Sequence, residues 1–308
     1  MQIAQSPAPW WKIPLRAKSI AGKIPAVAAL VLVVVSGACS TSRLASRAMI
    51  PIIENTRDFA LAYPDVETFL AATPSNLFLI EGMIASDRGN DKLRLTASML
   101  YFSYGFTRIE EHDPGYASFL YLKGLEHASA ILKKRSSVRA AWDGRLEEFE
   151  TMCAQFETED APAIAWAAAN WAQFISLHLD STAVLPDIPR VAALLERANE
   201  LDGSYFMGLS HITLGILHAF RPPMLGGDPA RSLEHFTRAF ELSENNFFIC
   251  HYFYARYYCY RTQDAAAFET TLEEILERPA SAAPRYRLLN QIAKEKARHL
   301  LEEKDELF

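Results

Sequence analysis

Glycine is scarce in this sequence, with 13 residues in 308, about 4% against an average near 7%. Together with the lack of long runs that alternate apolar and polar residues, this argues against a turn-rich β-sandwich or β-barrel. Excess positive charge is also missing from the body of the chain. Residues 1–38 hold four basic groups and no acidic group, so the remainder has 27 of the 31 basic residues against all 37 acidic ones. Phosphates would repel such a body, which argues against a nucleic-acid partner.

Motifs typical of enzymes are missing as well. The chain has no Gly-x-x-x-x-Gly-Lys phosphate-binding loop, no Gly-x-Ser-x-Gly elbow and no His-Glu-x-x-His zinc motif. His211 and His218 are seven residues apart, but no carboxylate or cysteine stands at ligand spacing from them. The sequence therefore predicts a protein that is not an enzyme and that holds no cofactor and no metal.

Cysteine is rare, with four residues, and no pair forms a Cys-x-x-Cys motif. Cys250 and Cys259 would stand roughly 13 Å apart along one helix, too far for a disulfide. We expect Cys153, Cys250 and Cys259 to be buried, unreactive thiols.

The remaining cysteine follows a segment that is typical of secretory signals. A basic stretch ends at Lys23, twelve mostly apolar residues follow from Ile24 to Val35, and Gly37-Ala38-Cys39 closes the segment. Because spanning a bilayer takes roughly 20 apolar residues, the segment is short for a transmembrane helix. The pattern predicts a bacterial lipoprotein signal peptide over residues 1–38, with lipidation at Cys39 and a tether over residues 39–48.

Two details bear on this interpretation. Lipoprotein signals usually place Leu three residues before the cysteine, where this chain has Ser36. The alternative is an ordinary cleaved signal or an N-terminal anchor, with Cys39 incidental. Ser40 after the cysteine favours sorting to the outer membrane. We therefore expect a periplasmic protein that contacts the membrane through a lipid anchor only.

From residue 49 onward the apolar residues recur at helical spacing. Asp113-Pro114 and Asp228-Pro229 are typical helix starts, an N-cap followed by Pro at the first helical position. An offset of 115 residues aligns more than these caps: Ala117, Tyr121, Gly124 and Glu126 match Ser232, Phe236, Ala239 and Glu241. Val191, Leu195 and Ala198 repeat the spacing, and Phe268, Leu272 and Ile275 repeat it weakly after Asp264.

A small, an aromatic and a small residue at steps of four and three is the second-helix pattern of the tetratricopeptide repeat (TPR). Hairpins of this kind cannot bury their apolar faces alone and must stack on one another. The repeats are degenerate, so the sequence predicts an all-α fold, a TPR-like stack of helical hairpins forming a compact solenoid. We expect one domain over residues 49–308, interrupted most visibly at 221–227, where two prolines and two glycines stand together.

Aromatic density is the remaining feature. Eight aromatic rings fall within residues 247–260, and two tryptophans flank the alanines and Asn170 of residues 165–171. One interpretation is a buried central helix whose phenols bond internally. The other is an aromatic wall around an apolar ligand, with Arg256 or Arg221 receiving a carboxylate or capping helix carbonyls. The candidate ligand- or partner-binding residues are Trp166, Asn170, Trp171, Arg221, Tyr254, Arg256, Tyr257 and Tyr258.

Several ordered stretches, from roughly Leu77 to Phe308, resemble a known family. The most specific are residues 221–228 (RPPMLGGD), 254–258 (YARYY) and 289–293 (LNQIA), preceded by 81–85 (EGMIA), 101–106 (YFSYGF), 121–125 (YLKGL) and 166–171 (WAAANW). The chain is similar to the TatT component of TPR-protein-associated TRAP transporters. It departs from that family at Asn170 and Gln173, where small residues are expected, and at Ser36.

The resemblance implies a helical periplasmic lipoprotein that assembles as a trimer and associates with the solute-binding protein of a TRAP transporter. It also implies an apolar ligand held in a pore or cleft of each protomer. The first hypothesis is therefore an accessory component that binds or channels a partly apolar organic acid and docks the solute-binding subunit. The alternative is a TPR-like envelope lipoprotein that scaffolds protein complexes, which predicts an open superhelix with polar Asn- and Lys-rich concave positions.

Overall fold

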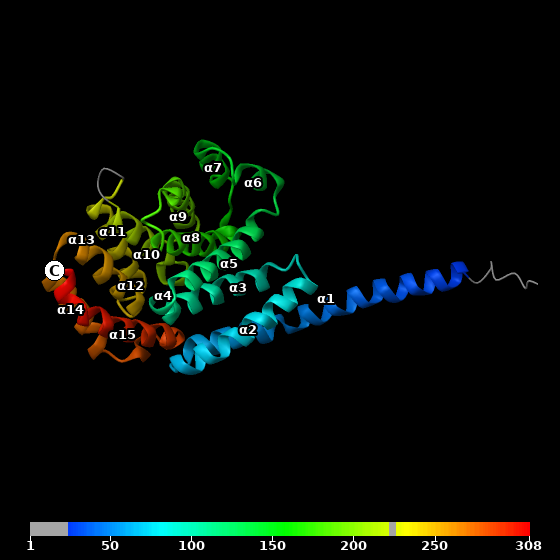
Figure 1. Cartoon of the computed structure of the whole chain (residues 1–308), viewed down its shortest axis with the longest axis horizontal. Coiled ribbons are helices and arrows are strands. Elements are labelled where there is room, and N and C mark those ends of the chain that lie inside the picture. The colour runs from blue at the N-terminus through cyan, green and yellow to red at the C-terminus, as the bar shows by residue number, and fades with distance from the viewer. Residues whose placement is uncertain (1–23, 222–225) are drawn as a thin grey trace, which may run out of the picture.

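The computed structural model describes residues 24–221 and 226–308, with side chains from Thr41 onward except that of Arg108. Within these residues every regular element is a helix and there is no strand, which confirms the all-α fold. The longer helices lie side by side in a compact body, and α1 extends away from it (Figure 1). The helical elements are α1 (Ile24–Ala62), α2 (Val66–Ser86), α3 (Asp91–Tyr104), the π-helix η3 (Gly105–Ile109), α4 (Glu110–His112), α5 (Pro114–Leu132), α6 (Ser136–Ala141), α7 (Leu146–Cys153), η4 (Thr158–Asp160), α8 (Ala161–Ser176), η5 (Thr182–Asp187), α9 (Ile188–Asp202), α10 (Tyr205–Phe220), α11 (Pro229–Leu242), α12 (Phe248–Phe253), the π-helix η7 (Tyr254–Cys259), α13 (Tyr260–Thr262), α14 (Ala265–Glu277), η8 (Ala280–Ala282), η9 (Pro284–Tyr286), α15 (Arg287–Glu302) and α16 (Lys304–Leu307).

The helices pair into hairpins in chain order. α3 packs on α5, α8 on α9, α10 on α11, and the run α12–η7–α13 on α14. Neighbouring hairpins then pack on each other through α5 and α8 and through α8 and α10. The four copies of the repeat pattern found in the sequence are thus the second helices of four hairpins.

Burial follows the repeat pattern closely. Tyr121 and Phe236 are completely buried, and so are Leu195 and Leu272 at the matching positions of α9 and α14. The predicted helix starts are confirmed too, since Asp113, Asp228 and Asp264 each accept a hydrogen bond from a backbone N–H of the first turn.

The three cysteines of the body are free and buried. Burial raises the pKa of the Cys153 thiol and of the Cys259 thiol to about 12. Burial also raises the pKa of the Cys250 thiol well above its usual value. The prediction that the three thiols are buried is confirmed, and their raised pKa values favour the protonated, less reactive form at neutral pH.

The N-terminal helices connect the two ends of the stack. The end of α1 contacts α2 and α3 on one side and η9 and α15 on the other, and α2 also contacts α15 (Figure 1). α1 is continuous through the expected signal boundary and tether. The structure describes no side chain at Cys39, and residues 1–23 lie outside the described part. Among the helices searched, α2 is long and apolar enough to cross a membrane, yet it packs against α1 and α3.

Candidate functional site

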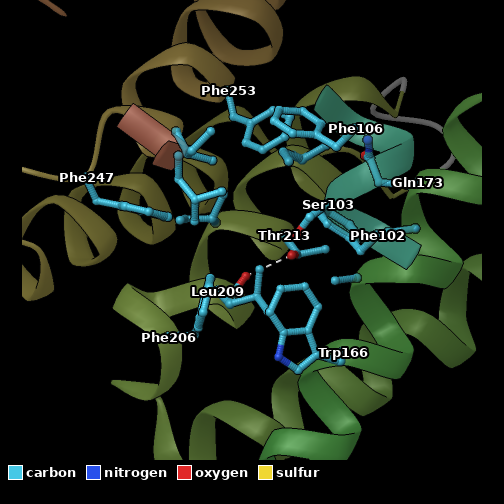
Figure 2. Close-up of a pocket in the computed structure, with 16 residues that line it drawn as sticks. Phe102, Ser103, Phe106, Trp166, Gln173, Phe206, Leu209, Thr213, Phe247 and Phe253 are labelled. Atoms are coloured by element: carbon cyan, nitrogen blue, oxygen red, sulfur yellow. Dashed lines mark hydrogen bonds between the residues drawn. The ribbon is translucent and has the colours of Figure 1, made fainter. Parts of the chain in front are cut away.

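The first helices of the hairpins enclose a narrow apolar cavity. Its volume is about 40 Å³, and residues of α3, η3, α8, α10, α12 and α15 form most of its wall. Figure 2 shows Phe102, Phe106, Trp166, Phe206, Phe247 and Phe253 around it, with Ser103 and Thr213 between them. Leu209, Ile212, Ile216, Ile249 and Leu289 complete most of the apolar wall. Because the wall comes from segments spread over nearly 190 residues, only the folded stack creates this cavity.

The aromatic rings in the wall touch one another edge to face. Trp166 lies 5.4 Å from Phe102 and 5.0 Å from Phe206, centroid to centroid, at interplanar angles of 71° and 72°. Phe106 lies 5.2 Å from Phe253 in a tilted arrangement. Such pairs are favoured by the ring quadrupoles and hold each ring in place.

Polar atoms in the wall have partners. The Thr213 hydroxyl donates to the Leu209 carbonyl at 2.8 Å within α10 (Figure 2). Gln173, which is buried, donates from Nε2 to Glu110 Oε2 at 3.1 Å. The cavity is therefore apolar along most of its length and has an amide at the Gln173 end.

Behind Gln173 lies a cluster of charged and phenolic groups that two π-helices bring together. Glu110 directly follows η3 and accepts a second hydrogen bond from the Tyr121 hydroxyl at 2.5 Å. Burial and the Glu110 carboxylate raise the pKa of Tyr121 well above its usual value, so this phenol stays protonated. Arg256 lies within η7 and donates to the Tyr252 hydroxyl at 3.0 Å. π-helical turns are frequent at functional sites because the extra residue re-aims neighbouring side chains.

Two cations belong to this cluster. Tyr252, Tyr257 and Glu110 raise the pKa of Arg256, so its guanidinium is always charged. Lys296 of α15 is 3% exposed, donates to Glu111 Oε1 at 2.5 Å and lies 4.6 Å from the centre of the Phe106 ring. The aromatic wall thus separates an apolar cavity from buried positive and negative charges.

Of the eight residues predicted from the sequence, Trp166 lines the cavity. Its indole Nε1 donates to the Tyr205 hydroxyl at 3.1 Å. Arg256 and Tyr257 lie one helical turn beyond Phe253, and the Tyr257 and Phe253 rings are 6.0 Å apart. These two residues therefore belong to the charged cluster behind the wall.

Asn170 and Trp171 lie elsewhere on α8. Asn170 is fully buried, donates to Ser98 Oγ at 3.1 Å and to the Trp166 carbonyl at 2.9 Å, and packs over Gly124 of α5. Trp171 stacks on Trp142 at 6.1 Å and donates from its indole to Asp187 Oδ2 at 3.2 Å. Both hold α8 against its neighbours.

Arg221, Tyr254 and Tyr258 are also away from the cavity. The Arg221 Nε donates to the Leu217 carbonyl at 2.9 Å, which caps the end of α10. Tyr254 stacks on Tyr258 at 5.0 Å and meets Phe236 edge to face. Pro222 to Leu225 of the conspicuous stretch lie outside the described residues.

The sequence analysis did not single out most of the cavity wall. Phe102 and Phe106 belong there only to the stretch 101–106 of the family resemblance, and Gln173 is named only as a departure from the family pattern. Phe206 carries no sequence signal apart from Gly208 two residues later, which allows unusual backbone angles. In the described residues no group of three His, Cys, Asp or Glu side chains could hold a metal ion.

Comparison with known proteins agrees with this architecture. A search of curated proteins found no match. The model of one family, described as the TRAP transporter T-component, matches residues 63–308, which include all the hairpins and the cavity. The chain therefore belongs to the TRAP transporter T-component family.

Proposed function

From this membership, and from the aromatic cavity, we propose that the protein is a periplasmic lipoprotein component of a TRAP transporter that binds or channels a partly apolar organic acid. The family is one of transporter components and not of enzymes. The observation that carries the proposal is the cavity lined by aromatic and aliphatic side chains of α3, η3, α8, α10, α12 and α15. A wall of this kind gives affinity for an alkyl or aryl group by removing it from water.

The charged cluster supports an acid as the ligand. Arg256 is three residues after Phe253 and close enough to Glu110, the hydrogen-bond partner of Gln173, for this carboxylate to raise its pKa, so its guanidinium stays charged at physiological pH. A carboxylate that reached the Gln173 end would accept a hydrogen bond from the amide and be attracted by the guanidinium. Glu110 opposes this attraction, so the amide of Gln173 is the group we assign to direct contact and Arg256 acts from behind it.

Attachment and partners follow from the same proposal. Lipidation at Cys39 would hold the protein at a membrane, with the outer membrane favoured by Ser40. The partner would be the solute-binding protein of the transporter, and the protein would work as a homo-oligomer, for which we propose a trimer.

The alternative role, a scaffold for envelope complexes, predicts polar concave positions that would bind peptides. The inner faces of the hairpins carry Phe102, Trp166, Phe206 and Phe253 instead. Such faces suit a small apolar ligand better than a peptide backbone.

Native mass spectrometry of the full chain, purified gently from its own cells, tests the proposal. We expect a bound acid of low mass and co-purification of a periplasmic solute-binding protein. A chain that binds neither its own ligand nor added dodecanoic acid, and that instead carries envelope-assembly proteins, would support the scaffold.

A matched pair of tryptophan variants separates binding from folding. Trp166→Leu removes an indole from the cavity wall, whereas Trp142→Leu removes a buried indole that does not line it. Both lower stability, and only Trp166→Leu should lower the bound fraction of dodecanoic acid. Equal losses in the two variants would place the ligand elsewhere.

A further inference from the structure

A second and larger cavity lies between the N-terminal helices and the body. It has a volume of about 230 Å³, and α1, α2 and α3 supply most of its wall. The lining is mainly apolar and includes Phe59, Tyr63 and Leu79, which are exposed to solvent. We refer to it below as the outer chamber, and to the cavity among the first helices as the central cavity.

The two cavities meet at two side chains. Ser103 and Phe206 line both of them. Ser103 is a small side chain on α3, whereas Phe206 presents a whole ring. A molecule that passed between the cavities would therefore have to pass Phe206.

Phe206 sits at the centre of an aromatic collar. Its ring meets Trp166 at 5.0 Å, Tyr286 at 5.2 Å and Phe247 at 6.4 Å, each edge to face. These neighbours belong to α8, η9 and the start of α12, so the collar joins distant parts of the stack. Each edge-to-face contact favours the present position of the ring.

The backbone that carries Phe206 is unusual. Phe206 (φ 47°, ψ 54°), Met207 (φ 58°, ψ 33°) and Gly208 (φ 78°, ψ 34°) form three consecutive left-handed residues at the start of α10. For residues other than glycine this conformation costs about 1–2 kcal/mol each, so such residues persist only where the surroundings hold them. The collar contacts are among the interactions that hold the Phe206 ring in place.

We propose that the outer chamber is a second binding site for the same partly apolar acid, and that Phe206 is the gate between it and the central cavity. This inference rests on the proposed function, because it takes its ligand class from there. At about 40 Å³ the central cavity is too small for an organic acid while Phe206 is in place, whereas the outer chamber, at about 230 Å³, is more than five times larger. Moving the ring out of the collar would join the two spaces.

Photolabelling of the full chain in the membranes that contain it tests the gate. The probe is dodecanoic acid with a diazirine near its methyl end, and labelled peptides are identified by mass spectrometry at increasing times after mixing. Peptides of α2 report the outer chamber, and peptides of α8 and of α10 beyond Leu209 report the central cavity. In the unsubstituted chain we expect label in α2 first and in α8 and α10 later.

Two variants should change the passage of the probe between the cavities in opposite directions. Phe206→Ala should speed labelling of α8 and α10 about tenfold, because the collar contacts that oppose opening are lost. Ser103→Phe fills the passage from the other side and should confine the label to α1 and α2. Phe240→Ala is the matched control, since Phe240 is half-buried and lines neither cavity, and it should label like the unsubstituted chain.

The outcomes separate the two proposals. No label in α8 or α10 of any form of the chain would contradict the proposed function. Label there with none in α1 and α2, or with equal rates in all variants, would overturn the gate and leave the function standing. Circular dichroism checks the fold, and Phe206→Leu, which keeps an apolar side chain but removes the ring, replaces Phe206→Ala if that variant is unfolded.

Discussion

Tyr121 of α5 and Phe236 of α11 occupy the same position of two hairpins, 115 residues apart, and pack in two different ways. Tyr121 lies against Gly105 of η3 and donates its hydroxyl to Glu110. Phe236 lies against Gly215 of α10 and meets Tyr254 edge to face. The aromatic ring does the same packing work in both hairpins, but only one of them carries a polar group into the core.

The small residues next to these aromatic rings also differ between the two hairpins. Three residues after the aromatic, α5 has Gly124 and α11 has Ala239. Gly124 leaves room for the Asn170 side chain of α8, whose amide bonds Ser98 and the Trp166 carbonyl. The hairpin of α3 and α5 thus makes room for a buried amide from α8, whereas the Phe236 ring in the hairpin of α10 and α11 packs against a glycine and another aromatic ring. One repeat pattern fits both hairpins, because stacking depends on the spacing of the small and aromatic residues along the second helix.

Gly124→Ala should have the largest effect on this comparison. A Cβ at residue 124 would lie 2.1 Å from Asn170 Oδ1, and a short, buried side chain cannot move far. We expect the free energy of unfolding to fall by about 3 kcal/mol. Urea denaturation measures it.

The second hairpin and a double variant give the controls for Gly124. Ala239→Gly should cost about 1.5 kcal/mol, from one methyl group and added backbone freedom. Adding Asn170→Ala to Gly124→Ala should recover part of the lost stability. If the double variant is no more stable than Gly124→Ala alone, the clash is not the cause.

Gly215→Ala tests the packing under the aromatic rings. A Cβ at residue 215 would lie 2.9 Å from the Phe236 ring, whereas one at Gly105 would lie 3.1 Å from the Tyr121 ring. We expect a loss of about 2 kcal/mol for Gly215→Ala and a smaller loss for Gly105→Ala. Thermal unfolding of the two variants side by side checks which loss is larger. A larger loss for Gly105→Ala would mean that the packing around Phe236 adjusts to an added methyl group more easily than the packing around Tyr121.

Tyr121→Phe makes the first hairpin like the second. It removes a hydrogen bond to the Glu110 carboxylate, so stability should fall by about 1.5 kcal/mol. Phe236→Tyr is the reciprocal change and adds a hydroxyl to a completely buried ring that faces Gly215, so it should also destabilise. Gains in stability for either exchange, measured by urea denaturation, would show that the two sites are interchangeable.

Acid should weaken the hairpin of α10 and α11 through its histidines. Burial, with nearby positive charges, lowers the pKa of His218 and of His235 to about 4, whereas in the unfolded chain each titrates near 6.5. Between these values the unfolded chain binds more protons, so stability falls as pH drops from 6.5 towards 4. In the other hairpin, His127 already contacts Glu81 at 2.9 Å.

Urea midpoints at pH 7.5 and pH 5 measure this effect. The drop on acidification should shrink in His218→Leu and remain in His112→Ala, which changes an exposed histidine. A drop of unchanged size in His218→Leu would assign the acid sensitivity to other groups.

Much of the fold could be predicted because its determinants are local. The caps at Asp113, Asp228 and Asp264 and the steps of four and three residues act within one or two helical turns, and the helices follow them. The resemblance to a known family added that these stretches occur in the same order as in its members.

The cavity was harder to predict, because its wall is set by contacts between distant helices. Trp166 could be found from its position among alanines, but Trp171, five residues on, packs on Trp142 instead of the cavity. The left-handed turn at Phe206 and Met207 opposes the local preference of both residues, so only tertiary packing can impose it. The same holds for the π-helices, which place Glu110 and Arg256 behind one wall.

The part of the chain that matches the family begins at residue 63, just after the last residue of α1. The central cavity lies wholly within that shared part, but α1 supplies a wall of the outer chamber from before it. On the route that we propose, the ligand would therefore first meet a chamber with one wall outside the shared part, and then a cavity that lies entirely inside it.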